Sequence, residues 1–293
     1  MRYFKSDDSL EYPEFDYTAY RKRHRIFTVL RSDRPWLNGV LFLLTIASTY
    51  FIGRSWAYTV SIMSILFCHE MGHYLMARKH HIRATLPYFI PLPLPPFGTL
   101  GAIIRMEHVI PNRKALFDVG VAGPLAGLAV TIPVIIYGLA HSQIMPLSSM
   151  SRGTLQLGDS LLFKLLSYWV VGHVPAGYDV VLHPAAYAGW AGLLVTALNL
   201  MPVGQLDGGH VVYAIFGGKK SKIVFNIAML GFIIIFIFFY WGWFLMVLFI
   251  LLFGFKHPPP LDDFTPIGRG RVILGIVTFI IFFLSFTPVP FKM

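Results

Sequence analysis

The sequence predicts an all-α polytopic membrane protein with about seven transmembrane helices and one small membrane-associated β element in the loop 86–105. Of its 293 residues, 56% are hydrophobic and only 13% are charged, whereas soluble domains carry roughly 45–50% apolar and about 25% charged residues. The mean hydropathy is +0.64. Six long apolar stretches occur along the chain, and most reach the ~18 residues that indicate a membrane-spanning helix.

The predicted spans follow these stretches in chain order. They cover 36–53, 56–77, 117–140, 184–202, 223–255 and 272–287. The stretch 223–255 holds 33 residues, and one helix of that length would measure about 50 Å against a hydrocarbon core of about 30 Å. We therefore divide it near Tyr240–Trp243, where aromatic side chains suit the membrane interface, into spans 223–239 and 241–255.

The basic residues alternate by loop. The segments 1–35, 78–114, 203–222 and 256–271 carry 8, 6, 3 and 3 Lys and Arg. The intervening loops hold only Arg54, Arg152, Lys164 and Lys292. Cytoplasmic loops of membrane proteins carry an excess of Lys and Arg, so the net charge of +10 indicates topology and not a nucleic-acid partner. We expect the N-terminus and the four rich segments on the cytosolic side.

The loops predict the remaining organisation. We expect a cytosolic segment 1–35 and a single transmembrane domain 36–293. Five prolines between 87 and 96 precede a short β-branched strand within 97–105. The far-side stretch 141–183 contains an apolar patch at 161–169 that suits an amphipathic helix on the membrane surface. Cys68 is the only cysteine, which excludes an internal disulfide.

The second span carries the pattern H-E-x-x-H, as His69, Glu70 and His73. On a helix, two histidines four residues apart lie on one face and can share a tetrahedral zinc, with the intervening Glu as general base. An ionisable group at this depth costs at least ~2.5–3.5 kcal/mol. A divalent metal would compensate for this cost, so the sequence predicts a metal site within the membrane.

A catalytic zinc usually takes three protein ligands and a water, and no glutamate follows Glu107 in the sequence. The extended pattern H-E-x-x-H-x-x-G-x-x-H also fails, because Met76 and Lys79 occupy its later positions. Asp207 is the best-placed third ligand because it follows the fourth predicted span on the side of His69 and His73. Asp118 is the alternative, although it also suits the helix dipole at the start of the third span.

These motifs together resemble the site-2 protease family of intramembrane zinc metalloproteases. The resemblance rests on H-E-x-x-H in one span and on N-x-x-P followed by L-D-G after a later one, from Asn199 to Gly208. It covers a core at 56–217, with extra spans at 36–53, 223–239, 241–255 and 272–287. The glycine-rich stretch 120–127 resembles the family's central helix. About 43 residues at 141–183 are too few for a PDZ domain, so the chain resembles the branch without one.

The resemblance implies the roles of the site residues. His69, His73 and Asp207 would bind one Zn²⁺ per chain, and Glu70 would be the catalytic acid and base. Asn199 becomes a candidate for holding substrate or the oxyanion, and the loop 86–105 lies where the family receives substrate. His210, one helical turn beyond Asp207 if a helix begins there, is a candidate for a supporting contact to the metal ligands.

The implied activity is endopeptidase cleavage within or near transmembrane segments of membrane-anchored substrates, in regulated intramembrane proteolysis or in clearance of signal-peptide remnants. The expected partners are such a substrate and the lipid bilayer. The alternatives are a membrane metal-ion transporter, which would tolerate Glu70→Gln, and a non-proteolytic membrane scaffold. We expect a bacterial cytoplasmic membrane, with a plastid membrane as the alternative. The sequence does not decide the oligomeric state or the substrate.

Overall fold

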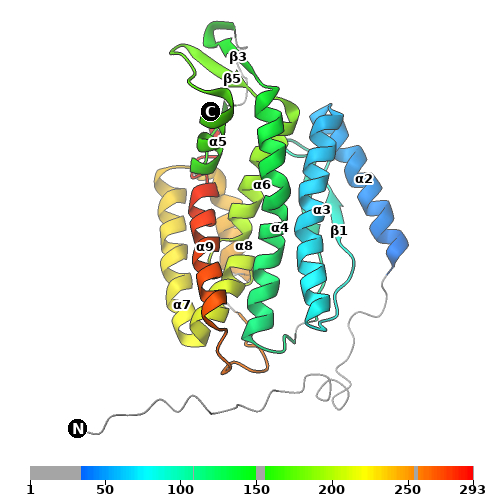
Figure 1. Ribbon diagram of the computed structural model, residues 1–293, viewed down its shortest axis with the longest axis vertical. Helices are drawn as coiled ribbons and strands as arrows, with labels where there is room; N and C mark the ends of the chain where they lie inside the picture. The colour runs from blue at the N-terminus through cyan, green and yellow to red at the C-terminus, as the bar shows by residue number, and fades with distance from the viewer. Residues whose placement is uncertain (1–33, 108, 150–155, 254–256, 293) are drawn as a thin grey trace, which may run out of the picture.

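The computed structural model describes residues 34–107, 109–149, 156–253 and 257–292, and all statements below concern these residues. Of the predicted cytosolic segment 1–35, only residues 34 and 35 are described. Residues 254 and 255, at the end of the predicted span 241–255, also lie outside the described residues. Long helices stand side by side and form most of the molecule (Figure 1). The helices are α2 (Pro35–Gly53), α3 (Trp56–Lys79), α4 (Arg113–Ala140), α5 (Leu161–Val171), α6 (Pro184–Asn199), α7 (Asp207–Phe238), α8 (Phe244–Phe253) and α9 (Arg269–Ser285), with short 3₁₀ turns at Leu147–Ser149 and Trp241–Trp243.

Helix boundaries follow local capping chemistry. Ser55 and Asn112 lie immediately before α3 and α4, and their side chains accept hydrogen bonds from the backbone amides of Tyr58 and Ala115. A side-chain oxygen at this position satisfies an amide that has no partner within the helix. Pro184 opens α6, where its missing N–H costs nothing.

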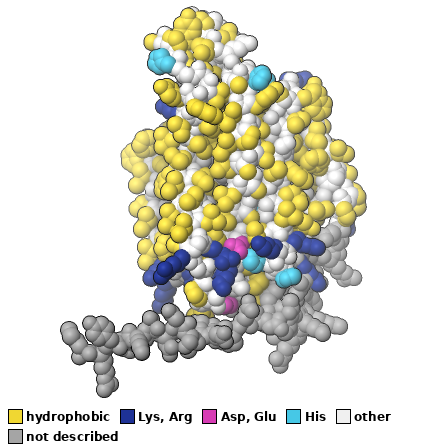
Figure 2. All heavy atoms as spheres, viewed as in Figure 1, with side chains coloured by type: hydrophobic (Ala, Val, Ile, Leu, Met, Phe, Trp, Pro, Cys, Tyr) yellow, Lys and Arg dark blue, Asp and Glu magenta, His cyan; other side chains and the backbone are white. Residues whose placement is uncertain are grey.

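Helix α4 is the centre of the bundle. It contacts α3, α6 and α7. Half of the residues in its most apolar stretch are buried, whereas the corresponding share in α2 and in α7 is 22%. The large apolar side chains of the outer helices point outward instead, including Leu43, Ile227 and Ile273. Hydrophobic side chains accordingly cover the middle of the molecule, and Lys and Arg form a band across its lower end (Figure 2).

Three helices are long and apolar enough to cross a membrane, namely α2, α4 and α7. Helices α3, α6, α8 and α9 occupy the other predicted positions, so seven transmembrane helices remain a prediction. The turn at Trp241–Trp243 separates α7 from α8 where the sequence predicts the division of its longest apolar stretch.

The basic segment 203–222 is helical for most of its length. Helix α7 begins at Asp207, and its only described break is Gly217, with φ 72° and ψ 178°. Glycine adopts this conformation without steric cost. A short helix therefore carries Asp207 and His210 before the apolar part of α7 begins.

The predicted β element is confirmed as an antiparallel hairpin of β1 (Tyr88–Pro91) and β2 (Thr99–Ile103). Strand β1 packs on α2, and β2 contacts α3. The tip of the hairpin reaches the end of the bundle where α2 and α3 meet, because Tyr58 Oη donates to the carbonyl of Phe97 at 2.7 Å and Ser48 Oγ donates to that of Gly98 at 2.6 Å. The hairpin thus packs against α2 and α3 as part of the bundle.

A small cap closes that end of the bundle, opposite the end at which α3 terminates (Figure 1). We define the cap as the described residues of 141–183 together with β6 (Phe291–Lys292). Helix α5 of the cap confirms the predicted helix at 161–169. Two antiparallel ribbons complete it, β3 (Gln143–Pro146) with β5 (Tyr178–Val181), and β4 (Gln156–Leu157) with β6.

Candidate metal centre

Helix α3 places His69, Glu70 and His73 deep in the bundle. The exposed fractions of these three residues are only 4%, 7% and 6%, respectively. The predicted pairing of the two histidines on one face is confirmed, because their Nε2 atoms lie 3.2 Å apart. Polar groups buried this deeply are costly unless they have partners, so the surrounding helices must supply them.

Asp207 supplies the third group from the first residue of α7. Its Oδ2 lies 3.3 Å from Nε2 of His73 and 3.5 Å from Nε2 of His69. The chain can bring it there because the two glycines that follow are packed against backbone: a Cβ on Gly208 would overlap the carbonyl of Leu200, and one on Gly209 would overlap that of Gly204. The two glycines therefore let the start of α7 pack closely against the turn after α6, which places Asp207 next to the histidines.

The three donor atoms fit a tetrahedral metal. All lie within 4.8 Å of one another, and their separations run from 3.2 to 3.5 Å. Ligand atoms bound to tetrahedral zinc at about 2.0–2.1 Å lie about 3.3–3.4 Å apart. Two imidazoles and one carboxylate are also a donor set that zinc accepts in catalytic sites. The residues present therefore fit a zinc ion with its fourth position open.

The backbone of α4 orients His73. Nδ1 of His73 lies 2.8 Å from the carbonyl of Val119, which can only accept, so in the neutral ring Nδ1 carries the proton and Nε2 keeps its lone pair for a metal. A Cβ on Gly123 would overlap Nε2 of His73, and one on Gly127 would lie 3.2 Å from Cβ of His69. The glycines of α4 thus leave the space that both imidazoles fill.

Asn199 and His210 both lie near this centre. Nδ2 of Asn199, the last residue of α6, lies 3.1 Å from Nε2 of His69. His210 lies one turn beyond Asp207 on α7, against Gly120 of α4. The structure therefore places Asn199 and His210 next to the three grouped residues, and their roles remain proposals.

His257, which no motif in the sequence singles out, contacts His210. Its Nδ1 lies 2.8 Å from the carbonyl of Pro258, and its Nε2 lies 2.7 Å from Nδ1 of His210. Burial lowers the pKa of His257, which favours a neutral ring whose Nε2 accepts the hydrogen bond from His210. The loop before α9 thereby fixes the orientation of His210. No local pattern links two histidines 47 residues apart, so only the fold reveals this pair.

Glu70 points toward the β hairpin. Its carboxylate interacts with the backbone amide of Ile104, the residue after β2. The acid on α3 therefore interacts both with two of the candidate ligands, His73 and Asp207, and with the residue that follows β2. This arrangement places a proton acceptor next to an extended backbone segment.

Asp118, the alternative third ligand, lies outside the group of three donor atoms. Its two carboxylate oxygens accept hydrogen bonds from Arg271 of α9 at 2.7 and 2.8 Å, and Nε2 of His80 lies 2.8 Å from the second oxygen. Five residues into α4, this carboxylate points toward α9 and the end of α3. It ties three helices together at the basic end of the bundle.

Replacing Asp118 by asparagine should therefore reduce stability without loss of metal. We expect the free energy of unfolding to fall by about 1–2 kcal/mol. The expected loss is less than for a fully buried ion pair, because Arg271 is partly exposed and solvent weakens its interaction with Asp118. Thermal unfolding of the purified protein in detergent measures this change, and elemental analysis measures the zinc content. A variant that loses its zinc but keeps its melting temperature would restore Asp118 as a ligand.

The grouping of His69, His73 and Asp207 is therefore a candidate zinc centre, buried in a bundle in which three described helices are long and apolar enough to cross a membrane. The chain belongs to Peptidase family M50, whose sequence pattern matches residues 57–240. The resemblance to the site-2 protease family that the motifs predict is thereby confirmed.

Relatives from plants agree with this assignment. "Probable zinc metalloprotease EGY1, chloroplastic" of Arabidopsis thaliana is 32% identical over 253 residues, which cover 82% of this chain and 44% of that protein. "Probable zinc metalloprotease EGY2, chloroplastic" of Oryza sativa subsp. indica is 29% identical over 277 residues, which cover 91% of this chain and 48% of that protein. The chain thus spans about half the length of these curated relatives. No solved structure matches the chain significantly.

Proposed function

We propose that this chain is an intramembrane zinc endopeptidase that hydrolyses peptide bonds within or near the transmembrane segments of membrane-anchored proteins. The observation that carries the proposal is the convergence of His69, His73 and Asp207 beside a buried Glu70. A scaffold protein has no need of four such groups in an apolar bundle, because each costs free energy to bury. The family and its zinc metalloprotease relatives support the same reading.

In the proposed mechanism, His69, His73 and Asp207 hold one zinc ion per chain. When bound, zinc lowers the pKa of water and polarises a carbonyl oxygen. The Glu70 carboxylate accepts the proton of the attacking water and delivers it to the amine of the departing peptide, which is general acid–base catalysis by a single residue. The Asn199 amide donates a hydrogen bond to the developing negative charge on the carbonyl oxygen.

The substrate must present an accessible carbonyl. A transmembrane helix hides its carbonyls in its own backbone hydrogen bonds, so its cleavage requires local unwinding. We propose that the unwound segment pairs with the edge of β2, which replaces the lost hydrogen bonds. The contact of Glu70 with the amide of Ile104 at the end of this strand supports the arrangement, because the paired segment would pass beside the acid.

Leu100→Pro tests this pairing. Leu100 lies at the irregularity of the hairpin, has no register partner on β1, and is 67% exposed. Removal of its N–H should lower kcat/KM by about tenfold, equivalent to one or two backbone hydrogen bonds of about 1 kcal/mol each, because the edge of β2 loses a donor. Leu100→Ala, which keeps the N–H, should stay within about twofold. Equal activities of the two variants would contradict strand pairing.

We propose that the protein acts as an integral membrane protein with its basic end on the cytosolic side, or on the equivalent side of an organelle membrane. The band of Lys and Arg supports this orientation (Figure 2). Arg78 and Lys79 at the end of α3 belong to the same end. The chloroplastic relatives support a plastid membrane, and the bacterial cytoplasmic membrane expected from the sequence stays a prediction.

Cleavage of membrane-anchored reporters tests the function. Purified protein in lipid nanodiscs is incubated with single-span reporters that carry a Gly-Pro pair near the basic end of the span, and the products are identified by mass spectrometry. We expect cleavage near the Gly-Pro pair that stops when a zinc chelator is added and returns with zinc. Zinc flux through vesicles in the absence of any cleavage would instead support the transporter.

A further inference from the structure

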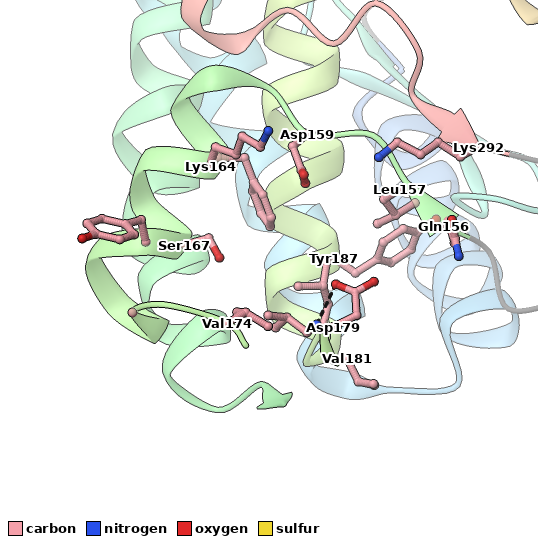
Figure 3. A pocket seen from close by; sticks show the side chains of 15 residues that line it. Gln156, Leu157, Asp159, Lys164, Ser167, Val174, Asp179, Val181, Tyr187 and Lys292 are labelled. Carbon is pink, nitrogen blue, oxygen red and sulfur yellow. Dashed lines mark hydrogen bonds between the residues drawn. The ribbon is translucent and has the colours of Figure 1, made fainter. Parts of the chain in front are cut away.

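A large cavity lies in the cap (Figure 3), and the cap lies at the opposite end of the bundle from the end of α3 (Figure 1). Its volume is about 750 Å³. The cap elements α5, β4, β5 and β6 line it together with the start of α6. It is separate from the candidate metal centre, since none of His69, Glu70, His73 and Asp207 lines it.

The charges around this cavity balance. Asp159 and Asp179 face it together with Lys164 and Lys292, and Figure 3 shows Asp159 between the two lysines. Burial raises the pKa of Asp159, while Lys292 and Lys164 oppose this shift. A site for an anionic lipid head group gathers Lys and Arg without carboxylates. Two charges of each sign suit a peptide, whose backbone is neutral and whose side chains carry either sign.

The wall formed by β5 presents a strand edge. Strand β5 pairs with β3 on one side, and among the described strands no other strand pairs with it. The carbonyl of Gly177, the residue before β5, accepts from the amide of Leu147 on that side, and the backbone groups of successive residues in the strand point alternately toward and away from β3. The amide of Val180 lies on the other side and donates to Oδ1 of Asp179 at 2.8 Å (dashed line in Figure 3). The amide of Tyr178, the other outward one in β5, donates to the carbonyl of Pro175 at 3.1 Å. Both outward amides of β5 are therefore paired within the chain, and this wall meets a ligand through its side chains.

The floor of the cavity contacts the tip of the β hairpin. Tyr187 lines the cavity, and its hydroxyl donates to the carbonyl of Pro96 at 3.0 Å. The ring of Phe97 lies 6.3 Å from that of Phe291 in β6. The other end of the hairpin lies beside Glu70. One structural element therefore joins the cavity to the candidate catalytic centre.

We propose that this cavity binds the extended peptide segment that follows the transmembrane span of the substrate on the cap side. This inference rests on the proposed function. Gly123, which packs on His73, and Ala140 at the end of α4 are 17 residues apart, or ~26 Å of helix. If the metal centre cleaves a substrate span at its basic end, the remaining ~26 Å of that span would lead to the cap, where the cavity begins. Binding there selects substrates by their flank.

A double-mutant cycle tests the proposal with defined probes. The reporter carries a ten-residue flank of alternating valine and threonine with one lysine and one aspartate, and a truncated reporter keeps two residues of it. Ser167→Trp fills the cavity from α5. Leu165→Trp is the matched control because Leu165 lies on the same helix, is 63% exposed and does not line the cavity. Zinc content confirms that each variant is folded.

We expect Ser167→Trp to raise KM for the long-flank reporter about tenfold, or about 1.4 kcal/mol, with kcat unchanged and no change for the truncated reporter. Leu165→Trp should behave as wild type with both. Equal effects of Ser167→Trp on the two reporters, or no effect on either, would overturn the proposal. A response to anionic lipid that is independent of the flank and lost in Ser167→Trp would assign the cavity to a lipid and also overturn it.

Photocrosslinking separates this proposal from the proposed function. Benzoylphenylalanine replaces Tyr168, which lines the cavity, in full-length Glu70→Gln protein. Crosslinks to the long flank and not to the truncated one support the cavity as a peptide site, even if the wild type cleaves neither reporter. The absence of flank-dependent crosslinks overturns the proposal, even if the wild type cleaves both.

Discussion

Glu70→Gln should lower kcat by about 10²- to 10⁴-fold, the range for loss of a general acid–base group, while the protein keeps its zinc. Glutamine has nearly the shape of glutamate but cannot accept the proton of water, and Glu70 is not among the three grouped donor atoms. KM should change little, because the lost interaction belongs to the transition state. The measurement is reporter cleavage under saturating substrate, with zinc determined on the same samples.

Glu107→Gln is the matched control for this prediction. It makes the same chemical change in the loop after β2, where the Glu107 carboxylate lies 3.4 Å from the amide of Arg83 in an exposed position. We expect activity within about twofold of wild type, as for most surface substitutions. Full activity of Glu70→Gln would remove Glu70 from the mechanism and would favour the transporter, for which only the metal ligands matter.

Gly123→Ala should weaken zinc binding although it replaces none of the candidate ligands. A Cβ at this position would overlap Nε2 of His73, and the imidazole has no room to retreat because its Nδ1 is held by the carbonyl of Val119. We expect zinc affinity to fall by at least about 10- to 100-fold, the range for changes around metal ligands, and cleavage to fall with it. Competition with a zinc-binding dye measures the affinity.

The control for this prediction is Gly39→Ala in α2. Nothing lies within 4 Å of a Cβ built on Gly39, so the same substitution meets open space in another apolar helix. We expect unchanged zinc affinity and cleavage. If Gly123→Ala also binds zinc like the wild type, His73 is not held against α4 as described, and the ligand assignment loses its strongest geometric support.

Local periodicity explains why much of the fold could be predicted from sequence. Apolar stretches of span length mark the positions of the main helices, and the cluster near Tyr240 marks the turn between α7 and α8. The two histidines share a face because four residues make about one helical turn. Asp207 could be selected because few acids follow the motif on the expected side.

The remainder depends on contacts between distant segments. Asp118 suited both a ligand and a helix-dipole role, and only the fold shows that Arg271, 153 residues away, pairs with it. A short helix beginning near Asp207 could be anticipated, but its continuation into one long helix interrupted only at Gly217 could not. His257 and the cap cavity gave no signal in a single sequence, since each combines elements far apart along the chain.

X-ray absorption at the zinc edge of the purified wild-type protein tests the central claim most directly. We predict one zinc per chain with nitrogen and oxygen ligands at about 2.0–2.1 Å, the outer-sphere pattern of two imidazoles, and no sulfur. A sulfur ligand at about 2.3 Å would point to Cys68, which precedes His69. That result, a pattern of three imidazoles, or a protein without zinc would contradict the site formed by His69, His73 and Asp207.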